Sequence, residues 1–103
     1  MDKQELEDQI ITKLQTIFDP EIPVNIFELG LIYTIRIDDD TNVEIDMTLT
    51  SPACPVAETL PPEVEMKIRT IQGINDLKVN LVWSPQWDKD MMSEVAKLKL
   101  GFL

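Results

Sequence analysis

Apolar residues recur at three- and four-residue spacing in the first part of the chain. This spacing predicts a helix over about residues 3–18, whose apolar stripe consists of Leu6, Ile10, Leu14 and Ile17/Phe18. Asp2 with Glu5 is typical of a capping box at the start of a helix. Asp19-Pro20 predicts its end, because the residue before a proline avoids the α region.

Strict alternation of apolar and polar residues replaces the helical spacing further along the chain. Residues 31–37 are rich in β-branched side chains and predict a strand, and the acidic stretch 38–42 predicts a turn. Residues 43–50 predict a second strand, which would form an antiparallel hairpin with one solvated face. The predicted core face of this strand is Val43, Ile45, Met47 and Leu49, and the solvated face is Glu44, Asp46, Thr48 and Thr50.

Helical spacing returns after a break at residues 51–55. It runs from Val56 to Ile71 and is closed by Gly73, with Pro61-Pro62 predicting a kink, or a short first turn and then a restart. Residues 77–83 predict a third strand. A last helix is expected from near Asp88 to a cap at Gly101, with its apolar side chains serving as core or interface: Met91, Met92, Val95 and Leu98.

The order of elements is therefore α-β-β-α-β-α. It predicts an α+β fold in which helices pack on one face of a small three-stranded mixed sheet. The 103 residues suit one domain, 1–103. No apolar run approaches the roughly 18 residues that span a bilayer, and the polar, acidic amino terminus lacks the pattern of a signal peptide. We therefore expect a cytoplasmic protein.

Charge and composition exclude several classes of function. The net charge is −10, from nineteen acidic and nine basic residues. Nucleic acids and anionic membranes are not expected as partners, because both are bound through clusters of Lys and Arg, whereas a protein with a basic face is favoured. The three glycines form no phosphate-binding loop.

The chain has no His and a single Cys, Cys54. The absence of His excludes Ser-His-Asp and Cys-His catalysis, and one Cys provides neither an internal disulfide nor a zinc site. Iron–sulfur clusters usually have four protein ligands, so the monomer is not expected to bind a cluster stably on its own. Transient binding of a cluster or of iron, across a homodimer or beside a client's cysteines, stays open.

Cys54 lies between two prolines, directly before the second predicted helix. Proline is favoured as the first helical residue, so Pro55 would make Cys54 the N-cap, where the helix dipole lowers a thiol pKa. A thiolate is both a nucleophile and a ligand for soft metals. Glu58 opposes this effect, and the alternative is that Cys54 is a small buried hydrophobic residue.

Polar residues elsewhere could support such a thiol. Asp19 and Glu21 flank Pro20 and could bind a metal or set a pKa, although on loop statistics alone a helix end with two solvated acids is the more common explanation. The hydroxyls of Thr48, Thr50 and Ser51 could donate to a sulfur or an anion, or could simply line the solvated face of an edge strand.

Two tryptophans bracket Ser84-Pro85-Gln86. Trp83 and Trp87 could form a partner-binding surface, because Trp is enriched at interface hot spots. The alternative is that they pack the last helix against the body of the protein.

Four stretches together resemble the SufT/PaaD-like family of iron–sulfur cluster assembly domains, which is also fused to some Mrp-type carrier ATPases. They are Asp19-Pro20-Glu21-Ile22-Pro23-Val24-Asn25-Ile26 with Leu29-Gly30-Leu31-Ile32-Tyr33; Met47-Thr48-Leu49-Thr50-Ser51-Pro52-Ala53-Cys54-Pro55; Val82-Trp83-Ser84-Pro85-Gln86-Trp87; and Met91-Met92-Ser93-Glu94 through Ala96-Lys97-Leu98 to Leu100-Gly101. The resemblance covers nearly the whole chain after the first helix.

This resemblance implies an accessory role in maturing iron–sulfur proteins beside a SUF assembly system, with no catalytic site. It implies that Asp19, Glu21, Thr48, Thr50 and Cys54 cluster in space, with Cys54 as the functional thiol. The implied partners are the assembly machinery and client apoproteins. Ser84 departs from the acidic residue expected before the proline, and Pro61-Pro62 falls inside the helix after the cysteine.

Two other functions remain as alternatives. One is a PaaD-like interaction module for a ring-oxidising complex, in which Cys54 is structural and the region from Trp83 to Trp87 binds the partner. The other is a single-cysteine thiol enzyme, which the lack of His and of nearby basic residues disfavours.

Overall fold

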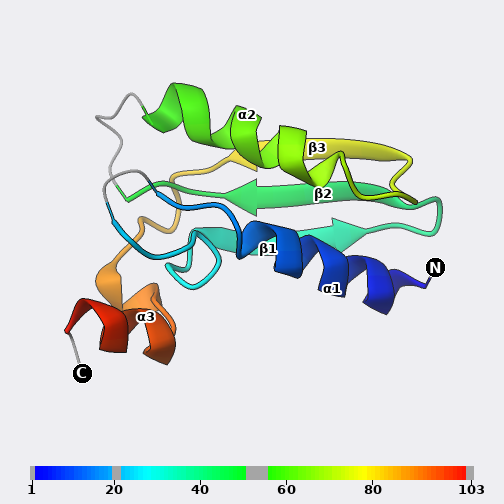
Figure 1. Cartoon of the computed structure of the whole chain (residues 1–103). Coiled ribbons are helices and arrows are strands. Elements are labelled where there is room, and N and C mark those ends of the chain that lie inside the picture. Colours follow the sequence, from blue (N-terminus) through cyan, green and yellow to red (C-terminus); the bar gives the residue numbers. More distant parts are fainter. Residues whose placement is uncertain (1, 20–21, 51–55, 102–103) are drawn as a thin grey trace.

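The computed structural model describes residues 2–19, 22–50 and 56–101. Its elements follow the predicted α-β-β-α-β-α order, with one short 3₁₀ turn added near the carboxyl end (Figure 1). The elements are α1 Lys3–Leu14, β1 Ile32–Ile37, β2 Asn42–Met47, α2 Val56–Ile68, β3 Asp76–Leu81, the 3₁₀ turn η1 Lys89–Met91 and α3 Glu94–Leu100.

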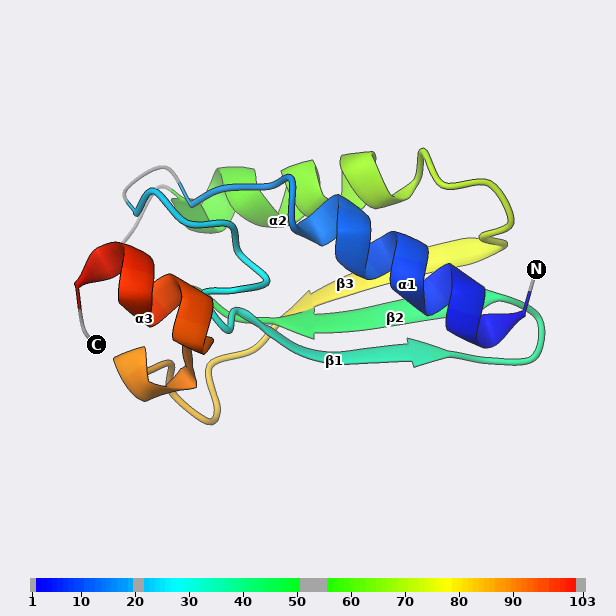
Figure 2. The ribbon, with the colours of Figure 1, turned by 60° about the horizontal axis from the view of Figure 1, so that its bottom comes forward.

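The three strands form one mixed sheet with β2 in the centre. β1 pairs with β2 antiparallel, and β3 pairs with β2 parallel. Figure 2 shows α1 and α2 side by side over one face of the sheet, with α3 beyond the end at which β1 begins. The α+β class and the mixed sheet predicted from the sequence are confirmed.

The core lies between the sheet and the two long helices. β2 contributes Val43, Ile45 and Met47, which are at most 3% exposed, as the alternation predicted. Full burial of an aliphatic side chain of this size contributes about 1.5–3 kcal/mol. The helices contribute one apolar stripe each: Leu6, Ile10 and Leu14 from α1, and Leu60, Val64 and Ile68 from α2.

The first helix is shorter than predicted. Asp2 caps it as expected, with its carboxylate accepting a hydrogen bond from the Glu5 amide at 2.8 Å. The α-helix ends at Leu14 instead of 18, because the chain tightens into a turn in which Thr16 donates through both its amide and its hydroxyl to the Lys13 carbonyl. Ile17 stays buried, whereas Phe18 is half exposed and is not part of the core.

The second helix runs through both prolines as one element, so of the two predicted alternatives, a kink or a restart, the restart does not occur. It ends at Ile68, before the predicted end near Ile71, because the chain passes into a tighter turn in which the amides of Thr70 and Ile71 donate three residues back. Gly73 follows in that turn with φ of +99°.

The predicted last helix is split in two. Met92 is extended between η1 and α3, and the Ser93 hydroxyl accepts from the Ala96 amide to start α3 anew. The break rotates the apolar side chains, so Met92 and Ala96 are buried while Val95 and Leu98 are exposed. No helix within the described residues is long and apolar enough to cross a membrane.

Candidate functional site

The carboxyl ends of the parallel strands β2 and β3 lie at the same end of the molecule as the start of α2. The segment between α1 and β1 is at this end too, in blue and cyan in both views (Figures 1 and 2). In parallel β-α-β arrangements, ligands often bind outside the carboxyl ends of the strands. Two predicted site residues, Asp19 and Thr48, belong to this end.

Asp19 and Thr48 are the buried polar residues of the described chain. Asp19 is 5% exposed and Thr48 is fully buried. The Thr48 hydroxyl has no hydrogen-bond partner among the described residues. Buried polar groups are nearly always satisfied, so an exception in a native fold calls for an explanation such as a ligand.

Burial of Thr48 corrects the prediction that it lies on the solvated face. β2 ends at Met47 instead of residue 50, so the strand alternation no longer applies. The Thr48 amide donates to the Leu31 carbonyl at 2.8 Å, which extends the antiparallel pairing of Ile32 with Met47 by one residue. Thr50, two residues on, is half buried.

Residues 25–31 form a hydrogen-bonded loop that joins the two buried polar residues. The Ile26 amide donates to the carbonyl of Ile17 at 2.8 Å, and Ile17 precedes Asp19 by two residues. At the far end, Leu31 donates to the Ile26 carbonyl at 3.1 Å and accepts from Thr48. The loop therefore holds the backbones around Asp19 and Thr48 in a fixed relation.

Three predicted site residues lie outside the described residues: Glu21, Ser51 and Cys54. The expected Cys54 N-cap with Pro55 as the first helical residue falls on the same segment, and the first residue assigned to α2 is Val56. Their roles stay predictions.

The two tryptophans have different environments. Trp83 is 43% exposed. Trp87 is half buried against the core, and its indole N–H donates to the Leu29 carbonyl at 2.8 Å. A shallow hollow, which was not predicted from the sequence, is lined by Gly30, Ile32, Tyr33, Pro85 and Met91.

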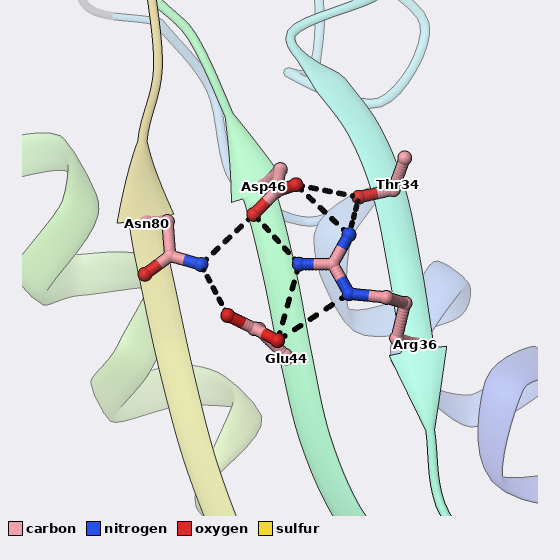
Figure 3. A network of polar contacts seen from close by, with 5 residues as sticks. All are labelled: Thr34, Arg36, Glu44, Asp46 and Asn80. Atoms are coloured by element: carbon pink, nitrogen blue, oxygen red, sulfur yellow. Dashed lines mark hydrogen bonds and ion pairs between the residues drawn. The ribbon is translucent and has the colours of Figure 1, made fainter.

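A second polar cluster, also missed from the sequence, covers the sheet face opposite α1 and α2 (Figure 3). Arg36 on β1 binds both carboxylate oxygens of Asp46 on β2, at 2.9 and 3.0 Å, and contacts Glu44 at 3.3 Å. Asn80 on β3 donates to both acids, at 2.6 and 2.9 Å. The pairing of Arg36 with Glu44 in the hairpin register was the available signal.

These contacts perturb the titration of the cluster. The Arg36 guanidinium, followed by Asn80, holds the pKa of Asp46 well below its usual range. Asn80, followed by Arg36, lowers the pKa of Glu44. Asp46, followed by Glu44, raises the pKa of Arg36. Since these groups already pair with one another, the cluster stabilises the open face of the sheet and offers no free ligand set.

Metal binding by the described residues alone is not indicated. They contain no group of three or more Cys, Asp or Glu side chains placed to hold an ion. The strand-end site, Asp19 with Thr48, has one buried carboxyl group and one buried hydroxyl that lacks a partner among the described residues. Of the two, the hydroxyl is the donor, and it suits a hydrogen bond to an anion or a sulfur.

Comparisons with known proteins agree with this architecture. A model of the family described as "Iron-sulfur cluster assembly protein" matches residues 7–81. The chain is 47% identical over 97 residues to an "Fe-S protein maturation auxiliary factor" of Porphyromonas gingivalis, covering 94% of this chain and 92% of the relative. It is 45% identical over 85 residues to the "Fe-S protein maturation auxiliary factor SufT" of Staphylococcus aureus, covering 82% and 97%.

A solved structure supports the same assignment. The crystal structure of a domain of unknown function from Bacillus anthracis superposes with a TM-score of 0.89 at 37% identity, covering 97% of this chain and 95% of the other. The resemblance seen in the sequence is therefore confirmed, and the chain belongs to the iron–sulfur cluster assembly protein family.

Proposed function

We propose that this protein is an auxiliary factor that helps iron–sulfur clusters reach client apoproteins in the cytoplasm, acting as one domain, 1–103. Membership of the family carries this proposal, together with extensive identity to proteins named as maturation factors. The cluster, or its iron, is the cargo and is not a resident cofactor.

Cys54 is the proposed functional thiol and transient ligand. It stands two residues before the start of α2 in the sequence. A single thiolate leaves most coordination positions of a cluster to other proteins, so the cargo can pass to a client's cysteines. This arrangement suits an escort better than a storage protein.

Thr48 and Asp19 are the proposed support for that thiol, with Glu21, Thr50 and Ser51. The support for this proposal is the buried Thr48 hydroxyl, which has no partner in the described chain and could donate to a cluster sulfide or a thiolate. Hydrogen bonds to sulfur are one of the means by which proteins tune iron–sulfur centres.

The proposed partners are SUF-type assembly proteins and client apoproteins. The net charge of −10 favours basic partner faces through long-range attraction. The exposed Trp83 ring offers an apolar contact.

The test is maturation in a bacterium that lacks its own homologous factor. Cells would carry the parent chain, Cys54→Ser, or Lys67→Met as a surface control on α2, and the specific activity of an iron–sulfur enzyme would be measured against its polypeptide level. The parent and Lys67→Met should restore activity, whereas Cys54→Ser should restore less than about a tenth, since even the loss of a residue that supports a metal ligand typically costs about tenfold or more. Full restoration by folded Cys54→Ser rejects the thiol role.

A further inference from the structure

Residues 84–93 contact the 25–31 loop through main-chain atoms of that loop, by two hydrogen bonds and one close backbone contact. The Trp87 indole N–H donates to the Leu29 carbonyl at 2.8 Å, and the Ser93 amide donates to the Glu28 carbonyl at 2.8 Å. Gly30 follows these two acceptors directly in the chain, and a Cβ there would collide with the Met91 carbonyl oxygen. Two hydrogen bonds and a close backbone contact thus act on three successive loop residues.

Both donors come from well-anchored positions. Trp87 packs partly buried against the core. Ser93 is the N-cap of α3, whose Ala96 is fully buried. Next to them, the Tyr33 hydroxyl on β1 donates to the Pro85 carbonyl at 2.8 Å. The segment therefore resists displacement, and the loop is held from outside.

The loop in turn sets the two buried polar residues. One end of it binds Ile17, just before Asp19, and the other end accepts the Thr48 amide through Leu31. Backbone hydrogen bonds thus connect the 25–31 loop, to which Trp87 donates, with the backbone next to Asp19 and with Thr48.

We propose that Trp87 is a positioning residue, whose indole N–H fixes the 25–31 loop and thereby the placement of Thr48 and Asp19. This inference rests on the proposed function. Gly30 is the matching element, because its small size and its φ of +80° allow the Met91 carbonyl to close against the loop. Residues 84–93 lie beyond residues 7–81, which the family model matches.

The test compares Trp87→Phe with Ile68→Val. Trp87→Phe keeps an aromatic ring and removes the N–H. Ile68→Val trims a fully buried side chain at the carboxyl end of α2, away from the loop, and serves as a control for lost stability. Each should lower the melting temperature by about 5 °C, the shift expected for one buried hydrogen bond or methyl group in a domain of this size. Gly30→Ala is a second variant, which disturbs the contact between the loop and residues 84–93 from the side of the loop.

Two readouts are taken well below the melting temperatures: the NMR amide shifts of Thr48 and Asp19, and client maturation. Trp87→Phe and Gly30→Ala should move both amide signals and reduce maturation at least about threefold, while Ile68→Val changes neither. Trp87→Phe spectra and maturation like those of Ile68→Val overturn the positioning role.

Cys54→Ser, run in the same panel, separates the two proposals. If Cys54→Ser matures clients normally, the proposed thiol function fails, whatever Trp87→Phe does to the Thr48 and Asp19 signals. If Cys54→Ser is inactive and Trp87→Phe behaves as Ile68→Val does, only the positioning inference fails.

Discussion

At the scale of single residues, Thr48 is the side chain whose surroundings are hardest to explain by stability alone. Its hydroxyl is fully buried and has no partner in the described chain, which costs about 1–3 kcal/mol in lost hydration. A valine of the same shape would avoid that cost. A serine would keep the hydroxyl and lose only a methyl group.

Thr48→Val should therefore be as stable as the parent, or more stable by about 1 kcal/mol, because a buried unpaired hydroxyl is removed. If the hydroxyl serves the cargo, maturation should nonetheless fall about tenfold, the equivalent of about 1.4 kcal/mol. Urea unfolding and the cellular maturation assay measure the two effects.

Thr48→Ser is the matched control, and should lose some stability while retaining maturation. Normal maturation by Thr48→Val would show that the hydroxyl has no role in function.

At the scale of elements, α2 carries a local conflict between sequence and structure. Pro61 and Pro62 both lie inside this helix, and each lacks the N–H that would bond four residues back. The helix persists because Leu60, Val64 and Ile68 are buried against the core. Tertiary packing here outweighs propensity, which is why the helix does not restart after the prolines.

Pro62→Ala should stabilise the fold, because it restores one helical hydrogen bond at an exposed position. We expect a net gain of about 1–2 kcal/mol after the greater freedom of the unfolded chain is counted. Thermal unfolding followed by circular dichroism measures it, and a lower melting temperature would contradict this account of α2.

The open face of the sheet makes a prediction about pH. Folding lowers the pKa of Asp46 and Glu44, so their contribution to stability is present above their usual pKa values of about 4 and fades as the pH falls below them. Arg36→Met should lower stability near neutral pH and make the further loss in acid smaller than that of the parent. Urea unfolding at pH values of about 7, 4 and 3 measures both effects.

Lys67→Met removes the same charge from an exposed pair with Glu63 and should leave the acid dependence unchanged. An equally steep acid loss in the parent and in Arg36→Met would exclude the network as its source.

At the scale of the whole molecule, periodicity alone predicted the order of elements and the buried face of β2. It failed where contacts distant in sequence decide the outcome. Thr48 follows strand alternation in the sequence and even extends the pairing of β1 with β2 opposite Leu31, yet its side chain is fully buried instead of solvated. Met92 matches a helical stripe, yet Ser93 caps a new helix after it.

The candidate site was predictable in part for the same reason. Asp19 and Thr48 were named as candidates from their chemistry and position, and the family resemblance implied that they cluster. The loop that connects them and its contact with Trp87 depend on tertiary hydrogen bonds. No local pattern in residues 25–31 indicates which distant donors will meet its carbonyls.

The most direct test of the central claim is cluster delivery by purified components without oxygen. An iron–sulfur apoprotein is mixed with iron and sulfide, and its return of activity is timed with the parent chain, with Cys54→Ser and with no added chain. The parent should raise the rate at least about tenfold, the equivalent of about 1.4 kcal/mol, and Cys54→Ser should match the sample without added chain. Equal acceleration by the parent and by Cys54→Ser would contradict delivery through this thiol.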